Sequence, residues 1–186
     1  ATLAVSAGIH YADLGGNTAI VFQQLQLDEI ARTHNASAIP DCGVAPGMVN
    51  ILAAAGIRDL DEAETVKIRV GGLPQNPTPP LKYQIVYSLH GVLDYYTTPS
   101  WVVRDGEPRQ VDALSEIEPV LFPEPVGELE AFHTAGGLST MPWTYQRRVR
   151  TMEYKTLRYP GHAAIMRAIR SLGLLELKPI NVGGHN

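Results

Sequence analysis

The sequence predicts an α/β fold in two parts, a parallel sheet with crossover helices first and a mixed sheet after it. Up to residue 60, short apolar segments alternate with helical segments, which is typical of parallel strands joined by helices. From Glu64 onward, Val66, Ile68 and Val70 alternate with polar residues, as in a strand that buries one face. The chain of 186 residues is 45% hydrophobic and 18% charged, so it can bury a sizeable core.

The first part should contain three helices and two strands. Ile20, Leu27 and Ile30 recur at helical spacing, and Asn17 or Thr18 precedes them as a suitable N-cap. The expected elements are the last turns of a helix at 1–8, a strand at 9–14, a helix at 19–33, a strand at 36–42 and a helix at 46–56.

The second part should be a mixed or largely antiparallel sheet with helices on one face. Asp105-Gly106 is a hairpin turn signal, and Pro160 and Gly173 mark the start and end of the last helix. The expected elements are a strand at 66–70 followed by a proline-rich loop, a helix at 88–96, a hairpin at 101–111, strands at 117–122, 128–133 and 148–158, and a helix at 160–172.

Composition and charge exclude several functions. The net charge is −4 and the 15 Lys and Arg residues are dispersed, so nucleic acid is not an expected partner. No apolar run approaches the roughly 18 residues of a membrane helix. The first residues lack a secretory signal and the chain has one cysteine, so we expect a cytoplasmic protein. No paired cysteines and no H-E-x-x-H motif occur, so no metal site is expected.

Two predicted strand exits carry the residues most suited to a ligand. Asp13 is followed by Gly15 and Gly16, and Cys42 is followed by a turn that contains Pro46 and Gly47. Neighbouring strand ends and helix starts form the ligand crevice of a doubly wound sheet. No two of the 17 glycines stand two apart, however, so the G-x-G-x-x-G turn of a dinucleotide site is absent.

Four runs of residues resemble the saccharopine dehydrogenase family, and within it the lysine 6-dehydrogenase-like branch. The runs are His10–Gly16, Pro40–Asn50, Glu130–Thr140 and Lys155–His162. The resemblance implies that residues 1–60 are the closing strands and helices of a Rossmann-like dinucleotide domain. It also implies that residues 61–186 form an α/β domain that binds substrate and supports dimerisation. Such enzymes oxidise or reduce a C–N bond of an amino acid with NAD or NADP.

Asp13 and Cys42 are the candidate catalytic residues. Asp13 can orient the nicotinamide, pair with a substrate ammonium or relay a proton, or it can simply cap a turn. Cys42 is either a chemical group or a small buried hydrophobe. For the other roles we expect cofactor contacts from Gly15, Gly16, Pro46, Gly47, Met48 and Asn50, and substrate contacts from His133, Thr134, Ser139, Thr140, Arg158 and Tyr159.

The reasons for these contacts differ. Backbone amides at the start of a helix can hold a carboxamide or a carboxylate, although the same residues make an ordinary helix N-terminus. The hydroxyl-rich loop after His133 can bind amino or carboxylate groups, or it can be a plain loop. Arg158 can hold a carboxylate with two hydrogen bonds, and an internal salt bridge with Asp94 or Glu153 is the alternative.

Three functions from different classes remain. The first is the catalytic and dimerisation part of an amino-acid dehydrogenase that uses NAD or NADP in the full-length enzyme, whereas the isolated chain should bind neither tightly. The second is a binding or assembly module without chemistry, and the third is a hydrolase that uses Cys42 with a histidine. A homodimer is expected through 64–111, a stretch rich in aromatic residues. They are Tyr83, Tyr87, Tyr95, Tyr96 and Trp101.

Overall fold

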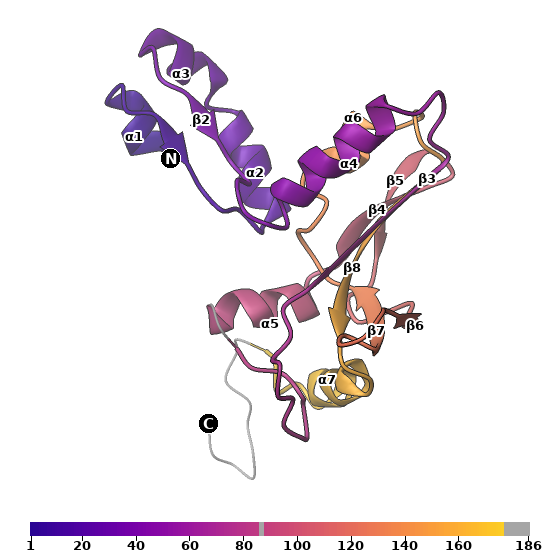
Figure 1. The fold of residues 1–186 in the computed structure, drawn as a ribbon. Helices are drawn as coiled ribbons and strands as arrows, with labels where there is room; N and C mark the ends of the chain where they lie inside the picture. Colours follow the sequence, from indigo (N-terminus) through magenta and orange to yellow (C-terminus); the bar gives the residue numbers. More distant parts are fainter. Residues whose placement is uncertain (86–87, 177–186) are drawn as a thin grey trace, which may run out of the picture. The chain divides into compact units, whose positions relative to one another are not determined.

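The computed structural model describes residues 1–85 and 88–176 (Figure 1). The chain divides into two compact units, each assembled from three stretches of sequence. Unit 1 comprises 1–68, 101–110 and 135–154, and unit 2 comprises the described residues of 69–100, 111–134 and 155–186. Within the described ranges, no helix is long and apolar enough to cross a membrane. The proposed division of the sequence near residue 60 stays a prediction.

Unit 1 contains the predicted parallel strands. Strand β1 (Tyr11–Ala12) pairs in parallel with β2 (Ala38–Ile39), with Tyr11 opposite Ala38. Its helices are α1 (Thr2–Ser6), α2 (Thr18–Leu25), α3 (Asp28–Thr33), α4 (Met48–Arg58) and α6 (Met141–Thr144). The parallel pairing confirms the expected strand and helix alternation, while the assignment to a Rossmann-like sheet stays a prediction.

The single helix expected over 19–33 is two helices. Asn17 caps α2 as expected, since its side-chain oxygen accepts hydrogen bonds from the backbone amides of Ala19 and Ile20. The first helix ends where the Leu27 amide bonds to the carbonyl of Gln24 three residues back, which tightens the last turn. Asp28 and Glu29 then occupy the first turn of α3, where negative charge is favourable.

The main sheet has six strands, most of them antiparallel. Hydrogen bonds join the strands in the order β5-β4-β8-β7-β6, and β3 also pairs with β8. The strands are β3 (Thr65–Gly71), β4 (Ser100–Arg104), β5 (Glu107–Val111), β6 (Glu118–Leu121), β7 (Glu128–His133) and β8 (Thr151–Arg158). The predicted mixed α/β fold is therefore confirmed. The β4–β5 hairpin turns at Asp105 and Gly106 as expected, with φ of 52° and 78°.

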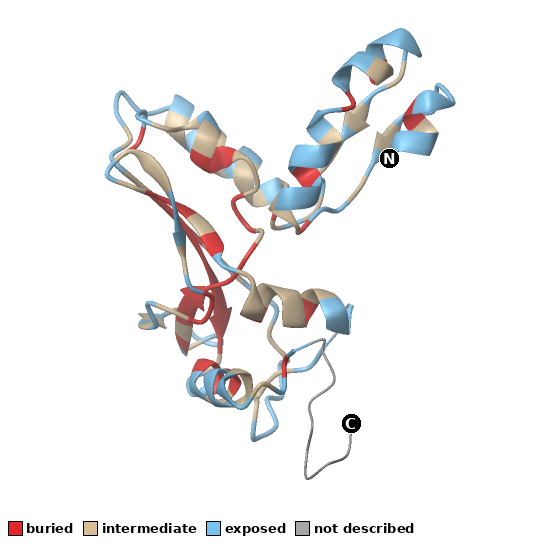
Figure 2. Cartoon of the chain, turned by 180° about the vertical axis from the view of Figure 1, so that it is seen from behind, coloured by how far each residue is buried: buried red, intermediate tan, exposed pale blue. Residues whose placement is uncertain are grey.

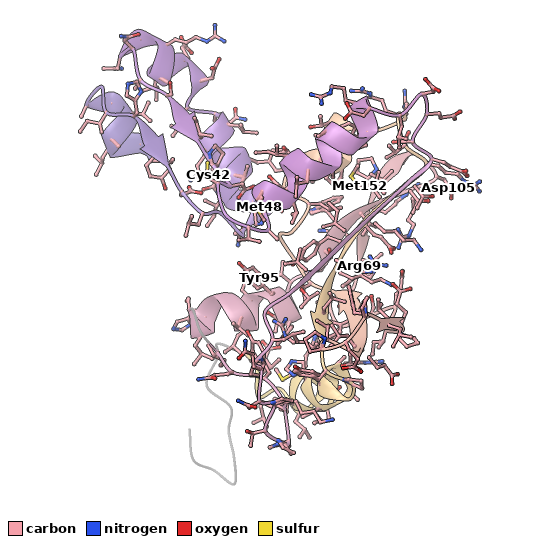
Figure 3. The ribbon with its side chains drawn as sticks, viewed as in Figure 1. Cys42, Met48, Arg69, Tyr95, Asp105 and Met152 are labelled. Carbon is pink, nitrogen blue, oxygen red and sulfur yellow. The ribbon has the colours of Figure 1, made fainter. Side chains whose placement is uncertain are left out.

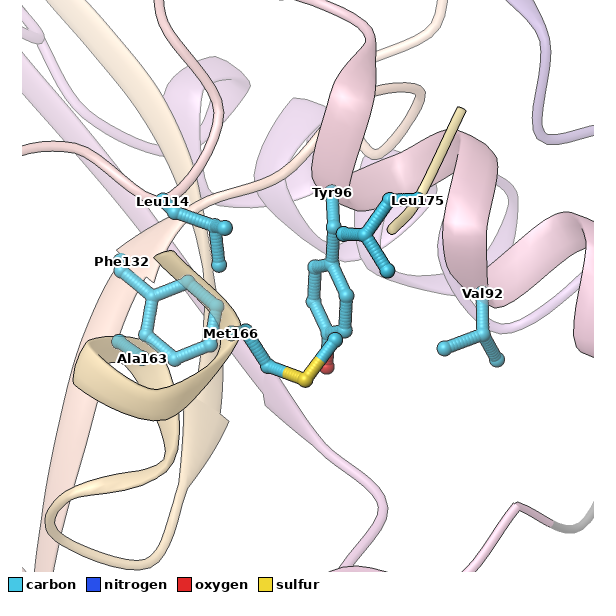
Figure 4. Packing of buried hydrophobic residues seen from close by; sticks show 7 residues of the cluster. All are labelled: Val92, Tyr96, Leu114, Phe132, Ala163, Met166 and Leu175. Atoms are coloured by element: carbon cyan, nitrogen blue, oxygen red, sulfur yellow. The ribbon is translucent and has the colours of Figure 1, made fainter. Parts of the chain in front are cut away.

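Unit 2 packs two helices, α5 (Leu89–Thr97) and α7 (His162–Ser171), around buried side chains. Figure 4 shows the cluster, which consists of Val92, Tyr96, Leu114, Phe132, Ala163, Met166 and Leu175. A second cluster is formed by Leu129, Ala131 and Leu157. Figure 2 shows that burial is concentrated in the strands, whereas much of α2 and α3 is exposed.

Two details of unit 2 differ from the sequence expectations. Tyr96, expected among exposed interface aromatics, is only 1% exposed because α5 turns it into the core. Tyr87, expected in the same interface, lies outside the described residues. The last helix begins at His162 and not at Pro160, because Gly161 is its N-cap with a φ of 95°.

Candidate functional site

The two predicted strand exits of unit 1 meet. Asp13 follows β1, and Asp41 and Cys42 follow β2. The amide of Asp41 donates to Oδ1 of Asp13 over 3.2 Å, and the amide of Cys42 donates to the Asp13 carbonyl over 2.7 Å. Figure 3 shows Cys42 and Met48 on the segment that leads from β2 into α4. Asp13 is therefore the residue at which the two exits are joined.

The Asp13 carboxylate has several hydrogen-bond donors. Oδ2 accepts from the Tyr11 hydroxyl over 2.9 Å and from the Gln24 side-chain amide over 2.5 Å. Burial is the largest single influence and raises the pKa of Asp13. The donors Gln24, Asp41, Tyr11 and the Gly15 amide together outweigh it, so the pKa lies below its ordinary value. Asp13 is thus ionised at neutral pH.

Asp41 is a second carboxyl group at the same place, and its pKa shifts the other way. Its Oδ1 accepts from the Gly16 amide over 3.3 Å, and Oδ2 accepts from the Ser139 hydroxyl. Burial raises the pKa of Asp41 most, and the charge of Asp13 raises it further, against the lowering effect of the two hydrogen bonds. The two neighbouring carboxyl groups therefore have pKa values displaced in opposite directions.

Glycine makes this arrangement possible at two positions. A Cβ on Gly15 would lie 1.6 Å from Oδ1 of Asp41, and a Cβ on Gly136 would lie 2.2 Å from the Gly16 carbonyl oxygen. Both glycines also have positive φ, 68° and 88°. The turn after β1 and the loop after β7 therefore approach closely, which brings Ser139 to Asp41.

Asn50 anchors the same loop from α4. Its Oδ1 accepts from the Gly47 amide over 2.5 Å, and its side-chain NH₂ donates to the carbonyls of Gly137 and Leu138, each over 3.2 Å. Pro46 is buried, and Met48 is 53% exposed. Of the predicted cofactor contacts on this segment, Asn50 uses its side chain inside the protein and Met48 faces outward.

The Cys42 thiol is exposed and has only backbone partners. It donates to the carbonyls of Ile39 and Pro40 over 3.3 and 3.8 Å. Across residues 1–85 and 88–176, no histidine is hydrogen-bonded to it. The geometry thus gives no support to the hypothesis of a hydrolase that uses Cys42 with a histidine.

Four predicted substrate residues belong to unit 2, where two of them are buried beside a lysine. His133 is fully buried, and its Nε2 donates to a Glu116 carboxylate oxygen over 3.1 Å. The Thr134 and Thr156 hydroxyls share a hydrogen bond of 2.7 Å. Lys155, opposite His133 in the β7–β8 pairing, is 3% exposed and donates to the Glu116 carbonyl over 2.7 Å. Sequence reasoning missed this buried lysine.

Arg158 and Tyr159 are also held by protein groups. Arg158 is 5% exposed, its Nη1 donates to the Leu157 carbonyl over 2.8 Å, and its guanidinium lies 4.2 Å from the centre of the Tyr83 ring. Its Nε is buried without a partner among the described residues. The Tyr159 hydroxyl donates to the Pro74 carbonyl over 2.9 Å. Their predicted contacts with substrate stay predictions.

His162 is a second buried titratable group that sequence reasoning missed. Its Nδ1 lies 3.0 Å from the Leu81 carbonyl, which accepts only, so Nδ1 carries the proton. Nε2 therefore accepts from the Tyr96 hydroxyl over 2.9 Å. Burial lowers the pKa of His162 most, and the ring is neutral at neutral pH. In the sequence, Pro160 two residues earlier indicated the start of a helix, and nothing indicated that His162 would be buried.

The predicted residues thus fall into two groups. The first lies in unit 1, where contacts join Asp13, Gly15, Gly16, Gly47, Asn50 and Ser139 into one site together with Asp41. Cys42 and Thr140 lie on the same segments. The second group, in unit 2, is His133, Thr134, Arg158 and Tyr159.

The comparisons with known proteins agree with this fold. Residues 43–183 match the family described as the saccharopine dehydrogenase C-terminal domain. The match covers most of the chain, which therefore belongs to this family. The fold is also similar to part of apo histidine-tagged saccharopine dehydrogenase (L-Glu forming) from Saccharomyces cerevisiae, with a TM-score of 0.69 and 18% sequence identity. That alignment covers 94% of this chain and 40% of the yeast chain, so this chain spans less than half of that length.

Proposed function

We propose that this chain is the catalytic and dimerisation part of an NAD(P)-dependent amino-acid dehydrogenase that acts on a C–N bond within a longer protein. The observation that carries the proposal is the pair Asp13 and Asp41. Their carboxyl groups lie at adjacent strand exits, are joined through one amide, and have pKa values displaced in opposite directions. The family membership supports the same reaction class.

Oxidation of a C–N bond requires groups that manage protons. A nicotinamide cofactor, when bound, would supply the ring that receives the hydride. The amine must be neutral before it can lose that hydride, and water must then attack the resulting iminium carbon. Asp13, ionised and half-buried, is suited to take the proton of a substrate ammonium. The Gln24 side-chain oxygen beside it is a buried acceptor without a partner in the described chain, and it suits the same ammonium.

The residues here fit the nicotinamide end of the cofactor and not its phosphates. Val44 and Met48 are 58% and 53% exposed on the segment after β2, and they offer an apolar surface for a flat ring. Gly15, Gly16, Pro46, Gly47 and Asn50 would shape that end of the site. Because no glycine-rich phosphate turn is present, we propose that the isolated chain binds neither NAD nor NADP tightly, which calorimetric titration tests.

The finer parts of the proposal concern substrate and assembly. Oxidation of the ε-amino group of lysine, as in the lysine 6-dehydrogenase branch, is the specificity that the sequence resemblance favours. Ser139, Thr140, Arg158 and Tyr159 are the residues proposed to contact the substrate. A cytoplasmic homodimer through 64–111 completes the proposal, and light scattering measures its mass.

Steady-state kinetics on the full-length protein test the proposal, with L-lysine, saccharopine and other amino acids as substrates. Asp13→Asn should lower kcat about 100-fold, since proton transfer by one positioned group contributes about that much. Asp59→Asn is the control, because Asp59 is exposed and pairs with its neighbour Arg58 on the surface. Arg158→Ala should raise KM roughly 30-fold, the effect of losing about 2 kcal/mol of carboxylate binding.

Two results would contradict the proposal. A wild-type protein that oxidises none of these amino acids would favour the alternative, a binding or assembly module without chemistry. An Asp13→Asn variant with wild-type kcat would leave Asp13 as a turn residue. An unchanged KM in Arg158→Ala would remove only the carboxylate role and would leave the reaction class standing.

A further inference from the structure

We infer that Asp41 positions the hydroxyl group of Ser139, and that Asp41 and Ser139 together form a second proton-accepting pair of the site. The inference rests on the proposed function and deepens it. Sequence reasoning assigned no role to Asp41, and it assigned Ser139 only to substrate binding.

The first support is the hydrogen bond between Asp41 and Ser139, which joins two segments that are far apart in the sequence. Ser139 lies 98 residues after Asp41, and its hydroxyl donates to Oδ2 of the Asp41 carboxylate. The other carboxylate oxygen accepts from the Gly16 amide. The Asp41 amide meanwhile donates to Asp13. Asp41 therefore ties Ser139, the turn after β1 and Asp13 into one arrangement.

The second support is the backbone on both sides of the contact. Asp41 has a φ of 61° and Ser139 has a φ of 52°, so two residues other than glycine adopt left-handed conformations where they meet. Such conformations cost free energy and persist where the surroundings impose them, often at functional sites. A chain that needed only a turn at these positions would be better served by glycine.

The third support is the space reserved for the carboxyl group. A Cβ on Gly15 would overlap Oδ1 of Asp41, so the turn can approach this oxygen only with glycine at position 15. Gly136 has the same relation to the Gly16 backbone. Both glycines permit the approach that places Ser139 on Asp41, and an ordinary surface loop has no need of either.

The pair gives the site a route for a proton. When water attacks the iminium carbon of the substrate, its oxygen forms the new C–O bond and it must lose one proton. Ser139 Oγ accepts that proton while its own hydroxyl proton passes to Oδ2 of Asp41. Asp41 gains one proton and the water loses one, so the step balances. The titratable groups linked to Asp41 by printed contacts or sequence are Asp13, whose carboxylate accepts from the Asp41 amide and from the Tyr11 hydroxyl, and the adjacent Cys42.

The test uses the full-length protein and the isosteric variant Asp41→Asn. The Asn side chain can still accept from Gly16 and can donate to Ser139, so the fold and the melting temperature should be unchanged. The variant cannot accept the proton. We therefore expect kcat to fall about 100-fold, with KM nearly unchanged and with one limb of the pH profile of kcat/KM lost.

Ser139→Ala and the double variant complete the design. Ser139→Ala should reproduce most of the loss, and Asp41→Asn combined with Ser139→Ala should be no slower than the worse single variant, because the two residues act as a unit. Asp59→Asn again serves as the exposed control.

The possible failures are distinguishable. If the wild type turns over an amino acid and Asp41→Asn keeps its kcat and its pH profile, the inference is overturned and the proposed function stands. Multiplicative losses in the double variant would also overturn it, since they would show independent roles. An inactive wild type would overturn both.

Discussion

Unit 1 and unit 2 hold their titratable groups in different ways. In unit 1, Asp13 and Asp41 lie at short strand ends, are partly exposed, and are held by loops and by one another. In unit 2, His133, Lys155 and His162 are 0–3% exposed and their polar atoms are bonded to the protein. The difference shows where proton chemistry is feasible, because a group must exchange protons with a ligand or with water.

The contrast is narrower for apolar residues, because unit 1 also buries Val102, Val103 and Met152. Helix α4 of unit 1 has eleven residues and none of them is buried. The core cluster of unit 2 contains Tyr96 and Phe132, which are 1% and 0% exposed. Substitutions in unit 2 should therefore act mainly on stability, whereas those at the strand exits of unit 1 should act mainly on function.

The largest expected effect compares two phenylalanines. Phe132→Ala empties a fully buried site in unit 2 and should lower the free energy of unfolding by about 3–5 kcal/mol. Phe22→Ala is the matched change in unit 1, where Phe22 is 37% exposed and makes an edge contact with Trp143. It should cost about 1 kcal/mol. Urea denaturation measures both, and equal losses would break the comparison.

A smaller effect concerns the buried histidine. Tyr96→Phe removes the donor to His162 Nε2 and leaves a buried acceptor unpaired, which should cost about 1–3 kcal/mol. Calorimetric melting of the variant beside the wild type measures it. No loss of stability would mean that water replaces the hydroxyl.

The same histidine predicts a pH dependence. Burial lowers the pKa of His162 below its usual 6.5, so the unfolded chain binds a proton more readily than the folded one. The stability from this group should be complete above about pH 6.5 and should be lost as the pH falls through the folded pKa. In His162→Gln this part of the slope should disappear, and an unaltered slope would assign it to another group.

Local sequence signals predicted most elements, and two examples show why. Asp105-Gly106 required a tight hairpin turn, and Asn17 required a helix start, because each signal acts within a few residues. The break between α2 and α3 was missed since Leu27 and Ile30 keep helical spacing across it. Apolar periodicity indicates which face of a helix is buried, but it does not indicate that the last turn of α2 is tightened and ends the helix.

The candidate site was predicted only in part, for a related reason. The order of Asp13 and Gly15 in the sequence indicates the end of a strand. The role of Asp41 depends on Ser139, and the burial of His162 depends on Tyr96 66 residues earlier. Such partners are set by how strands and loops meet, so residue type and spacing alone could not identify them.

The smallest expected effect tests whether α4 is uncovered. Gly56 lies inside this helix, its φ is not in the left-handed region, and a Cβ at this position would meet no atom within 4 Å. Gly56→Ala should therefore raise the free energy of unfolding by about 0.5–1 kcal/mol, because alanine restricts the unfolded chain and favours the helix. Chemical denaturation of the full-length variant measures the gain. A loss of stability would show that another surface packs against this face of α4, and the contrast between an open helix in unit 1 and the closed core of unit 2 would then fail.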